Sequence, residues 1–218
     1  MQLTRLKFLV IVFLFTVTTS ASANQAIKSN EVLLGAMSPF EDMIELALAG
    51  NDSNISKALA TADQHVTNVK TTLPASAASK FVTLVDDLHK ATTGKDHHKV
   101  ASSAVEIFRL LSDNLQAEVL DVPKEVSLLD YAGFKLRVLA ATQKPDWRDI
   151  RKTVDETAGW WNAINSKVSD KGLRNAFGTL IRGLEDAAKI NNLSMLRFAA
   201  QMDLDLVDLL EGDLKPKR

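Results

Sequence analysis

The sequence predicts an all-α protein with eight helices arranged as two successive sets of four. Apolar residues recur at alternating spacings of three and four, which places them on one face of a helix. Only five prolines occur in 218 residues, and no strand-like alternation is sustained. Residues 120–125, which include Pro123, divide the chain into halves with the same order of apolar stripes and breaks. Short breaks between long helices favour antiparallel packing. We therefore expect two tandem up-down-up-down four-helix bundles, or the same helices merged into one array.

The first 23 residues have the pattern of a secretory signal peptide. Arg5 and Lys7 precede an apolar run at residues 8–17, and small residues follow up to Ala21-Ser22-Ala23. The run is shorter than the roughly 18 apolar residues that a membrane span needs. We therefore expect cleavage after Ala23, a periplasmic or secreted protein, and no transmembrane span after cleavage.

The first half of the mature chain, residues 24–121, contains four helical stripes. Gly50 suits the left-handed end of the first helix, Pro74 follows the second, and Gly94 follows the third. The inward residues are, helix by helix, Leu33, Met37, Phe40, Ile44 and Ala47; Ile55, Leu59, Ala62, Val66 and Val69; Phe81, Leu84, Leu88 and Ala91; and Val100, Ala104, Ile107, Leu111 and Leu115.

The second half, residues 122–218, repeats this order after Pro123 and ends in a short basic tail. Its inward residues are Val126, Leu129, Ala132 with Gly133, Leu136 and Leu139; Trp147, Ile150, Val154, Ala158, Trp161, Ile164 and Val168; Leu173, Phe177, Leu180, Leu184 and Ala187; and Leu196, Ala199 with Ala200, Leu206 with Val207, and Leu210. Superposing the halves matches Phe81 with Phe177 and Leu88 with Leu184. An internal repeat is one interpretation; the loose alignment of any two leucine stripes is the other.

Composition excludes several classes of function. The 26 Lys and Arg residues nearly balance the 27 Asp and Glu residues, so no basic surface for nucleic acid is expected. The absence of cysteine removes disulfides, thiolate metal sites, iron–sulfur clusters and covalent haem attachment. The sequence also contains no Gly-x-Ser-x-Gly, no phosphate-binding Gly-rich loop and no His-Glu-x-x-His. We therefore nominate no catalytic residue and expect a protein that is not an enzyme.

Metal binding has only weak candidates. All four histidines lie in the first half, and Asp86 and His89 share a helix face. A carboxylate-bridged di-iron site would need a second Asp/Glu-x-x-His, which is missing. Met37 and Met43 are further candidate ligands, although such methionines more often fill cores. We expect no metal site and no cofactor, and keep Met37, Met43 and His89 as the weak candidates.

Each half resembles the cytochrome b562 family of four-helix bundles in length, helix order and polar breaks, for example at Phe40-Glu41-Asp42-Met43-Ile44-Glu45-Leu46. The resemblance implies a haem held by a methionine of the first helix, where Met37 stands, and a histidine of the fourth. Residues 111–116 and 208–211 occupy the matching histidine region, and neither contains histidine. The resemblance therefore implies the architecture without the haem.

One local feature of the second half points to binding. Gly133, Gly159, Gly178 and Gly183 lie inside expected helices, where each glycine costs roughly 1 kcal/mol relative to alanine. Close helix approach is one explanation, and a groove bordered by bulky residues is the other. The bordering residues are Tyr131, Phe134, Trp160, Trp161 and Phe177.

These observations predict an exported, non-enzymatic helical protein that binds a protein partner or a small ligand through its second half. The alternative is a periplasmic haem or metal carrier with atypical ligands. Trp160 carries the first prediction, because it points about 100° away from the inward stripe marked by Trp161. It is either a lid on the core edge or a contact residue, and tryptophan is enriched in binding hot spots.

Overall fold

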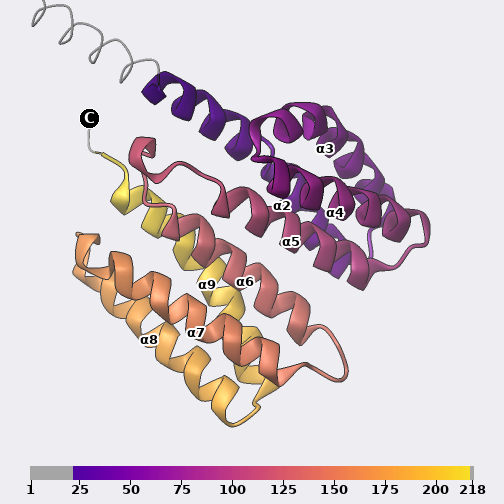
Figure 1. Cartoon of the computed structure of the whole chain (residues 1–218). Helices are drawn as coiled ribbons and strands as arrows, with labels where there is room; N and C mark the ends of the chain where they lie inside the picture. The colour runs from indigo at the N-terminus through magenta and orange to yellow at the C-terminus, as the bar shows by residue number, and fades with distance from the viewer. Residues whose placement is uncertain (1–21, 217–218) are drawn as a thin grey trace, which may run out of the picture.

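The computed structural model describes residues 22–216 and is all-helical over that range, as the sequence predicts (Figure 1). All but Ser22 and Ala23 of the predicted signal peptide lies outside the described residues, as do Lys217 and Arg218 of the basic tail. A helical segment at residues 22–35 precedes eight α-helices: α2 (Ser38–Leu48), α3 (Asp52–Thr72), α4 (Ala75–Thr93), α5 (His97–Asp113), α6 (Glu125–Ala140), α7 (Trp147–Ile164), α8 (Lys171–Lys189) and α9 (Leu193–Leu214). Two short 3-10 helices follow α5 and α7, at Ala117–Val119 and Asn165–Lys167.

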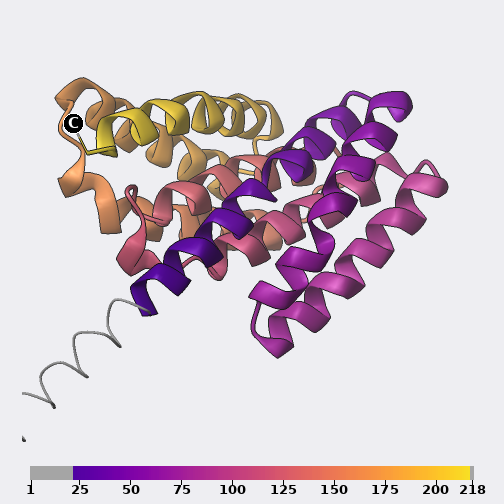
Figure 2. The same ribbon diagram turned by 90° about the horizontal axis from the view of Figure 1, so that it is seen from above.

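The helices contact one another in two rings of four. α2 and α4 each pack against α3 and α5, and α6 and α8 each pack against α7 and α9. Between the rings, α5 packs against α6 and α2 touches α6, so these helices lie in the middle of the molecule (Figures 1 and 2). The expected boundary at residues 121–122 falls in the connection between α5 and α6. None of the helices described is both long enough and apolar enough to cross a membrane.

Polar side chains begin five of the helices at the predicted breaks. Asn51, Asp96, Asp146, Asp170 and Asn192 each accept a hydrogen bond from a backbone N–H in the first turn of α3, α5, α7, α8 and α9. Each such cap is worth roughly 1 kcal/mol because it satisfies a donor that has no partner within the helix. Gly50, just before Asn51, has φ 69°, the left-handed conformation expected of it.

The first expected helix is broken where the sequence analysis made it continuous. The helical segment ends at residue 35, and α2 begins at Ser38 after a turn at Ala36 and Met37. Pro39 is the physical reason, because it has no N–H to donate to the carbonyl of Gly35 and its ring would crowd that carbonyl. The break separates the segment at residues 22–35 from α2, and this segment forms one wall of the pocket described below.

Helix α6 contributes to both apolar cores. Tyr131, Phe134 and Val138 pack into the core of the first half, whereas Leu129 and Leu136 are fully buried in the core of the second. At Gly133, α6 approaches α9 so closely that an added Cβ would lie 2.6 Å from Cδ2 of Leu204. Close helix approach therefore explains this glycine.

The other three internal glycines are not explained in this way. A Cβ on Gly159 would meet nothing within 4 Å, and those on Gly178 and Gly183 would make ordinary contacts at 3.9 and 3.8 Å.

Candidate functional site

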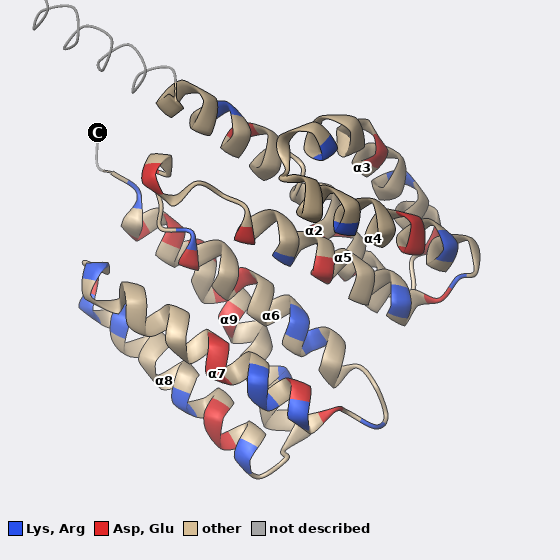
Figure 3. Ribbon diagram, viewed as in Figure 1, with Lys and Arg blue, Asp and Glu red and all other residues tan. Residues whose placement is uncertain are grey.

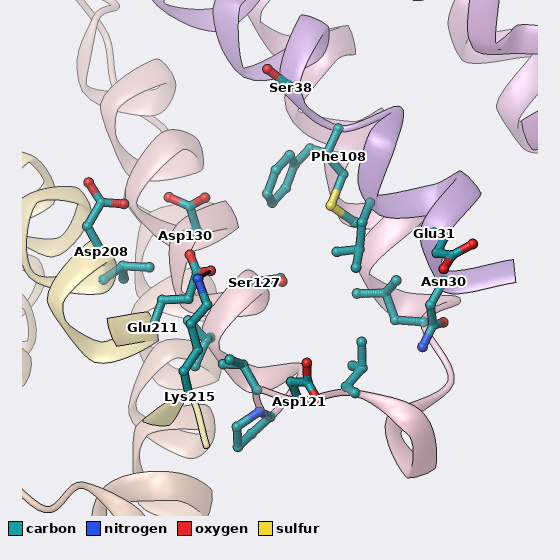
Figure 4. A pocket seen from close by; sticks show the side chains of 18 of the residues that line it. Asn30, Glu31, Ser38, Phe108, Asp121, Ser127, Asp130, Asp208, Glu211 and Lys215 are labelled. Atoms are coloured by element: carbon teal, nitrogen blue, oxygen red, sulfur yellow. Dashed lines mark ion pairs between the residues drawn. The ribbon is translucent and has the colours of Figure 1, made fainter. Parts of the chain in front are cut away.

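A pocket with a volume of about 590 Å³ lies where the two halves meet (Figure 4). Its walls come from the helical segment at residues 22–35, the start of α2, the connection between α5 and α6, and the facing ends of α6 and α9. Both the N-terminal and C-terminal parts of the described chain therefore contribute to it. A pocket at this place was not predictable from the sequence, because the walls of the pocket come from segments far apart in the chain.

Apolar and acidic side chains line different parts of this pocket. The apolar part includes Leu34, Met37, Phe108 and Leu115. Across the cavity from Phe108 lie Asp130 of α6 and Asp208 and Glu211 of α9 (Figure 4). The acidic segments of α6, α9 and the α5–α6 connection also lie close together in Figure 3. The pocket is therefore amphipathic, with three carboxyl groups of α6 and α9 across from Phe108, while Glu31 lies on the other side, beside Asn30.

Negative charge in the pocket is poorly balanced. Six lining residues carry a carboxyl group, and they are Glu31, Glu41, Asp121, Asp130, Asp208 and Glu211. Within the described part of the chain, the one cation in the lining is Lys215, and its Nζ is already paired with Oε1 of Glu211 at 2.5 Å. Like charges in one pocket raise each other's pKa. Burial, the neighbouring Asp42 and then Asp208 and Glu211 raise the pKa of Glu41 above its ordinary value.

Asp130 is the most perturbed carboxyl group that lines the pocket. It is half-buried, and no hydrogen bond or ion pair joins it to another residue within 22–216. Burial first, and then the charges of Glu41, Asp208 and Glu211, raise its pKa to about 8. Asp130 therefore holds a proton at neutral pH, although it faces a pocket.

A second buried acid lies beside Asp130. Asp203 of α9 is fully buried, and neither of its carboxyl oxygens has a hydrogen-bond partner among residues 22–216. Its Oδ2 faces α6 at Gly133, 3.0 Å from where a Cβ would stand. Burial and the neighbouring Asp130 raise the pKa of Asp203 well above its ordinary value, so it too is neutral. Asp203 itself does not line the pocket, but it lies one helical turn from Val207, which does.

The five aromatic residues singled out in the sequence do not line this pocket. Tyr131, Phe134, Trp161 and Phe177 are buried, and Trp160 is half-buried. Trp161 stacks on Phe177 in the second core, with ring centroids 4.6 Å apart. Tyr131 and Phe134 pack into the first core instead. The group is thus divided between two cores rather than gathered on one surface, and its proposed role in binding stays a prediction.

Trp160 contacts the other half of the molecule. The guanidinium of Arg109, on α5, lies 4.8 Å from the ring centroid of Trp160 and 4.9 Å from that of Tyr131. Arg109 also bonds to Asp113 at 2.8 Å and to Glu156 at 3.4 Å. The tryptophan that departs from the inward stripe of α7 therefore closes the seam between α5, α6 and α7.

The weak metal candidates are not brought together in one site. Met43 is buried in the first core, Met37 lines the pocket, and His89 on α4 pairs with Asp63 on α3 at 2.8 Å. No group of three or more His, Asp or Glu residues in the described range is placed to hold a metal ion. The pocket lining includes Met37 but no histidine, so these residues do not fit the haem ligation of the cytochrome b562 family.

A Ser, His and Asp set at the start of α3 is also not a catalytic triad. Asp52, Ser56 and His97 line a space of about 50 Å³. The Ser56 hydroxyl donates to the carbonyl oxygen of Asp52, and Nε2 of His97 contacts the Asp52 carboxylate at 2.6 Å. Hydrogen bonds from His97 and then from Lys95 lower the pKa of Asp52. The contacts join the N-terminus of α3 to the turn before α5, which is a structural role.

Sequence reasoning missed Asp130 and Asp203, although one of them left a signal. Asp203 falls on the inward stripe of the last helix, between Ala199 and Val207. A charged residue at a buried position of an amphipathic helix is unusual and points to a functional site. Asp130 gave no such signal, because its surroundings depend on how α2 and α9 meet α6.

Comparison of the chain with protein-family models, with curated proteins and with solved structures found no match. The resemblance to cytochrome b562 therefore stays a prediction from the sequence pattern, and any function must be inferred from the pocket.

Proposed function

We propose that this chain is an exported, non-catalytic binding protein whose pocket between the two halves takes a small organic cation with an apolar body. The observation that carries the proposal is the amphipathic lining, with an apolar side at Leu34 and Phe108 and a carboxylate side at Asp130 and Asp208. The leader pattern at residues 1–23 supports export. Three of the carboxylates come from the second half, the half that the sequence analysis favours for binding.

The size and charge of the pocket both suit such a ligand. Its volume of about 590 Å³ lies within the roughly 300–1,000 Å³ typical of small-molecule sites. An ammonium group beside the carboxylates is attracted most strongly where water is partly excluded. A hydrocarbon body against Leu34, Met37 and Phe108 contributes about 25 cal/mol for each Å² of apolar surface that it removes from water. A bare metal ion would use only the carboxylates, and they form no converging group.

Isothermal titration calorimetry at pH 8 with three eight-carbon probes tests the proposal on residues 24–218. Octylamine is cationic, octanoate is anionic and octanol is neutral, while the hydrocarbon chain is the same. We expect octylamine to bind at least tenfold more tightly than octanol, and octanoate to show no binding. Equal affinity for octylamine and octanol would contradict the role of the carboxylates, and failure of octylamine to bind would overturn the proposed function.

Matched variants locate the binding site. Leu34 lines the pocket, whereas Leu209 is an exposed leucine of α9 that does not. We expect Leu34→Asn to weaken octylamine binding several-fold and Leu209→Asn to leave it unchanged. The reverse result would place the ligand elsewhere on the molecule.

A further inference from the structure

Among residues 22–216, the carboxyl group of Asp130 faces negative charge from two neighbouring elements and no free cation. Glu41 faces it from α2, and Asp203, Asp208 and Glu211 face it from α9. Lys215 is already paired with Glu211. The cations on the other faces of α6 are also paired, because Lys135 contacts Glu106 of α5 and Asp149 of α7. The remaining pairs near α6 are Arg109 with Asp113 and Glu156, and Arg137 with Glu45.

In the ligand-free protein a proton takes the place of the missing cation. Several carboxylates in one partly buried pocket cannot all ionise, so at least one stays protonated. Asp130 is the group that stays protonated in the pocket, because its pKa is about 8. Asp203 is a neighbouring charge of Asp130 and is fully buried, with no hydrogen-bond partner among the described residues, so burial strongly disfavours its ionised form. Asp203 therefore keeps its own proton and adds no negative charge beside Asp130.

We infer that the ligand cation displaces the proton of Asp130, so that binding at the proposed site releases about one proton to water. This inference rests on the proposed function and adds its regulation. The carboxylic acid of Asp130 loses H⁺ to solvent, and the resulting carboxylate pairs with the cation, so charge and atoms balance. A neutral ligand leaves the proton in place, because only an opposite charge favours the ionised form.

The affinity of the pocket for its cationic ligand should therefore depend on pH, and it should increase as the pH rises. Below the pKa of about 8 in the free protein, binding must remove a proton, so affinity rises about tenfold for each pH unit. Above that pH Asp130 is already ionised in the free protein, and the affinity levels off. The protein would therefore hold its ligand in a neutral or alkaline medium and release it on acidification.

Titration calorimetry with octyltrimethylammonium measures the proton directly. This probe is permanently charged, so any proton released comes from the protein. Runs at pH 7 in phosphate and in Tris, which differ in ionisation enthalpy, give the number of protons per ligand bound. We expect about one proton released, and an affinity that rises roughly tenfold between pH 6 and pH 7.

Two variants assign the proton to its residue. The Asp130→Asn variant has no carboxyl proton to lose at this position. We therefore expect proton release on binding to fall to near zero, and the affinity for octyltrimethylammonium to become nearly independent of pH. Asp205→Asn is the matched control, because Asp205 is an exposed aspartate of α9 that does not line the pocket. The Asp205→Asn variant should still release about one proton on binding, and its affinity should still depend on pH. Proton release by Asp130→Asn equal to that of the unmodified chain would overturn the assignment.

Carbon NMR of the unmodified chain keeps the test independent of how the variants fold. The carboxyl signal of Asp130 should titrate near pH 8 without ligand and about three or more pH units lower with saturating octyltrimethylammonium. Binding without proton release, and with a flat affinity from pH 6 to pH 8, would overturn this inference and leave the proposed function standing. No binding of octyltrimethylammonium or octylamine would overturn both.

Discussion

Two acidic residues, Asp130 in the pocket lining and Asp203 next to it, oppose stability rather than support it. Asp130 and Asp203 are buried or half-buried acids without partners, and such groups destabilise a fold unless a ligand or a proton compensates them. Neither position is needed to make a helix, since the helices around them are specified by their apolar stripes. The two acids are therefore better explained by binding than by folding.

The pH dependence of stability tests this view of Asp130. Its pKa is about 8 in the folded chain and near 3.8 in the unfolded chain, so the folded state keeps a proton that the unfolded state loses. This group's contribution to the unfolding free energy is therefore greatest below pH 4 and falls by up to about 1.4 kcal/mol per pH unit until pH 8. Asp130→Asn removes this fall. We expect the variant to be more stable at pH 8, by on the order of 2–4 kcal/mol.

Urea unfolding of both proteins at pH 4.5, 6 and 8 measures the difference. The difference in unfolding free energy between Asp130→Asn and the unmodified chain should increase as the pH rises. Asp52 and Asp146, whose pKa values are lowered, change stability mainly at pH values below this range and equally in both proteins. A constant gap across the three pH values would show that Asp130 is already ionised in the folded state.

Gly133 is the other residue whose identity the packing dictates. An alanine Cβ would lie 2.6 Å from Cδ2 and 2.8 Å from Cγ of Leu204, so α6 and α9 would have to separate. We expect Gly133→Ala to destabilise the protein by about 1–3 kcal/mol, because overpacking outweighs the gain in helix propensity. Gly159→Ala is the control, since nothing lies within 4 Å, and it should stabilise by up to about 1 kcal/mol. Equal stability of the two variants in urea would contradict the close approach.

At the scale of elements, the helical segment at residues 22–35 is fastened to the α5–α6 connection by one side chain. Asn30 is buried; its amide donates to the Gln116 carbonyl at 2.9 Å and its oxygen accepts from the Gln116 N–H at 2.8 Å. These two bonds join two walls of the pocket. They are also independent of the Gln116 side chain, which supplies a matched control.

We expect Asn30→Ala to loosen these two walls without unfolding the bundles. Loss of both bonds leaves a backbone donor and acceptor unsatisfied, at a cost of roughly 1–3 kcal/mol. Hydrogen exchange should speed up at residues 22–35 and 116–123 and stay unchanged in α7 and α8. Gln116→Ala should leave the exchange as it is in the unmodified chain. If hydrogen exchange at residues 22–35 is as slow in Asn30→Ala as in the unmodified chain, apolar contacts alone hold the segment in place.

The elements themselves were predictable from sequence, whereas their partners were not. Spacings of three and four and breaks such as Gly50 and Asn192 predicted the eight helices, because both signals are local. The break at Pro39 was missed, since a proline early in a helix is compatible with a continuous apolar stripe. Helix α6 shows more clearly what could not be predicted, namely which core each of its apolar residues faces. The sequence suggested one inward stripe for it, but Tyr131 and Leu129 face different cores.

At the scale of the whole molecule, charged and aromatic side chains join the two halves. The guanidinium of Arg109 lies against the rings of Tyr131 and Trp160 and bonds to Glu156, and all three of these partners belong to the second half. Lys135 contacts Glu106, and Arg137 forms an ion pair with Glu45, across the same boundary. The pocket depends on this junction, because its apolar wall belongs mainly to the first half and three of its carboxylates belong to the second.

Arg109→Ala therefore tests whether the pocket is a property of the joined halves. The change removes two cation–π contacts and leaves Glu156 without its partner, so we expect a loss of about 1–3 kcal/mol in urea unfolding. Arg109→Lys should recover only part of this, because an ammonium lacks the planar group that lies against both rings. Arg151→Ala, which removes an exposed arginine of α7 that bonds to Asn191, should have little effect on stability.

Octylamine binding by Arg109→Ala tests the same point at the pocket. Arg109 does not line the pocket, so if Arg109→Ala binds octylamine more weakly, the cause is a change in how the two halves are placed relative to each other. Unchanged binding together with reduced stability would mean that each wall of the pocket is held in place within its own half.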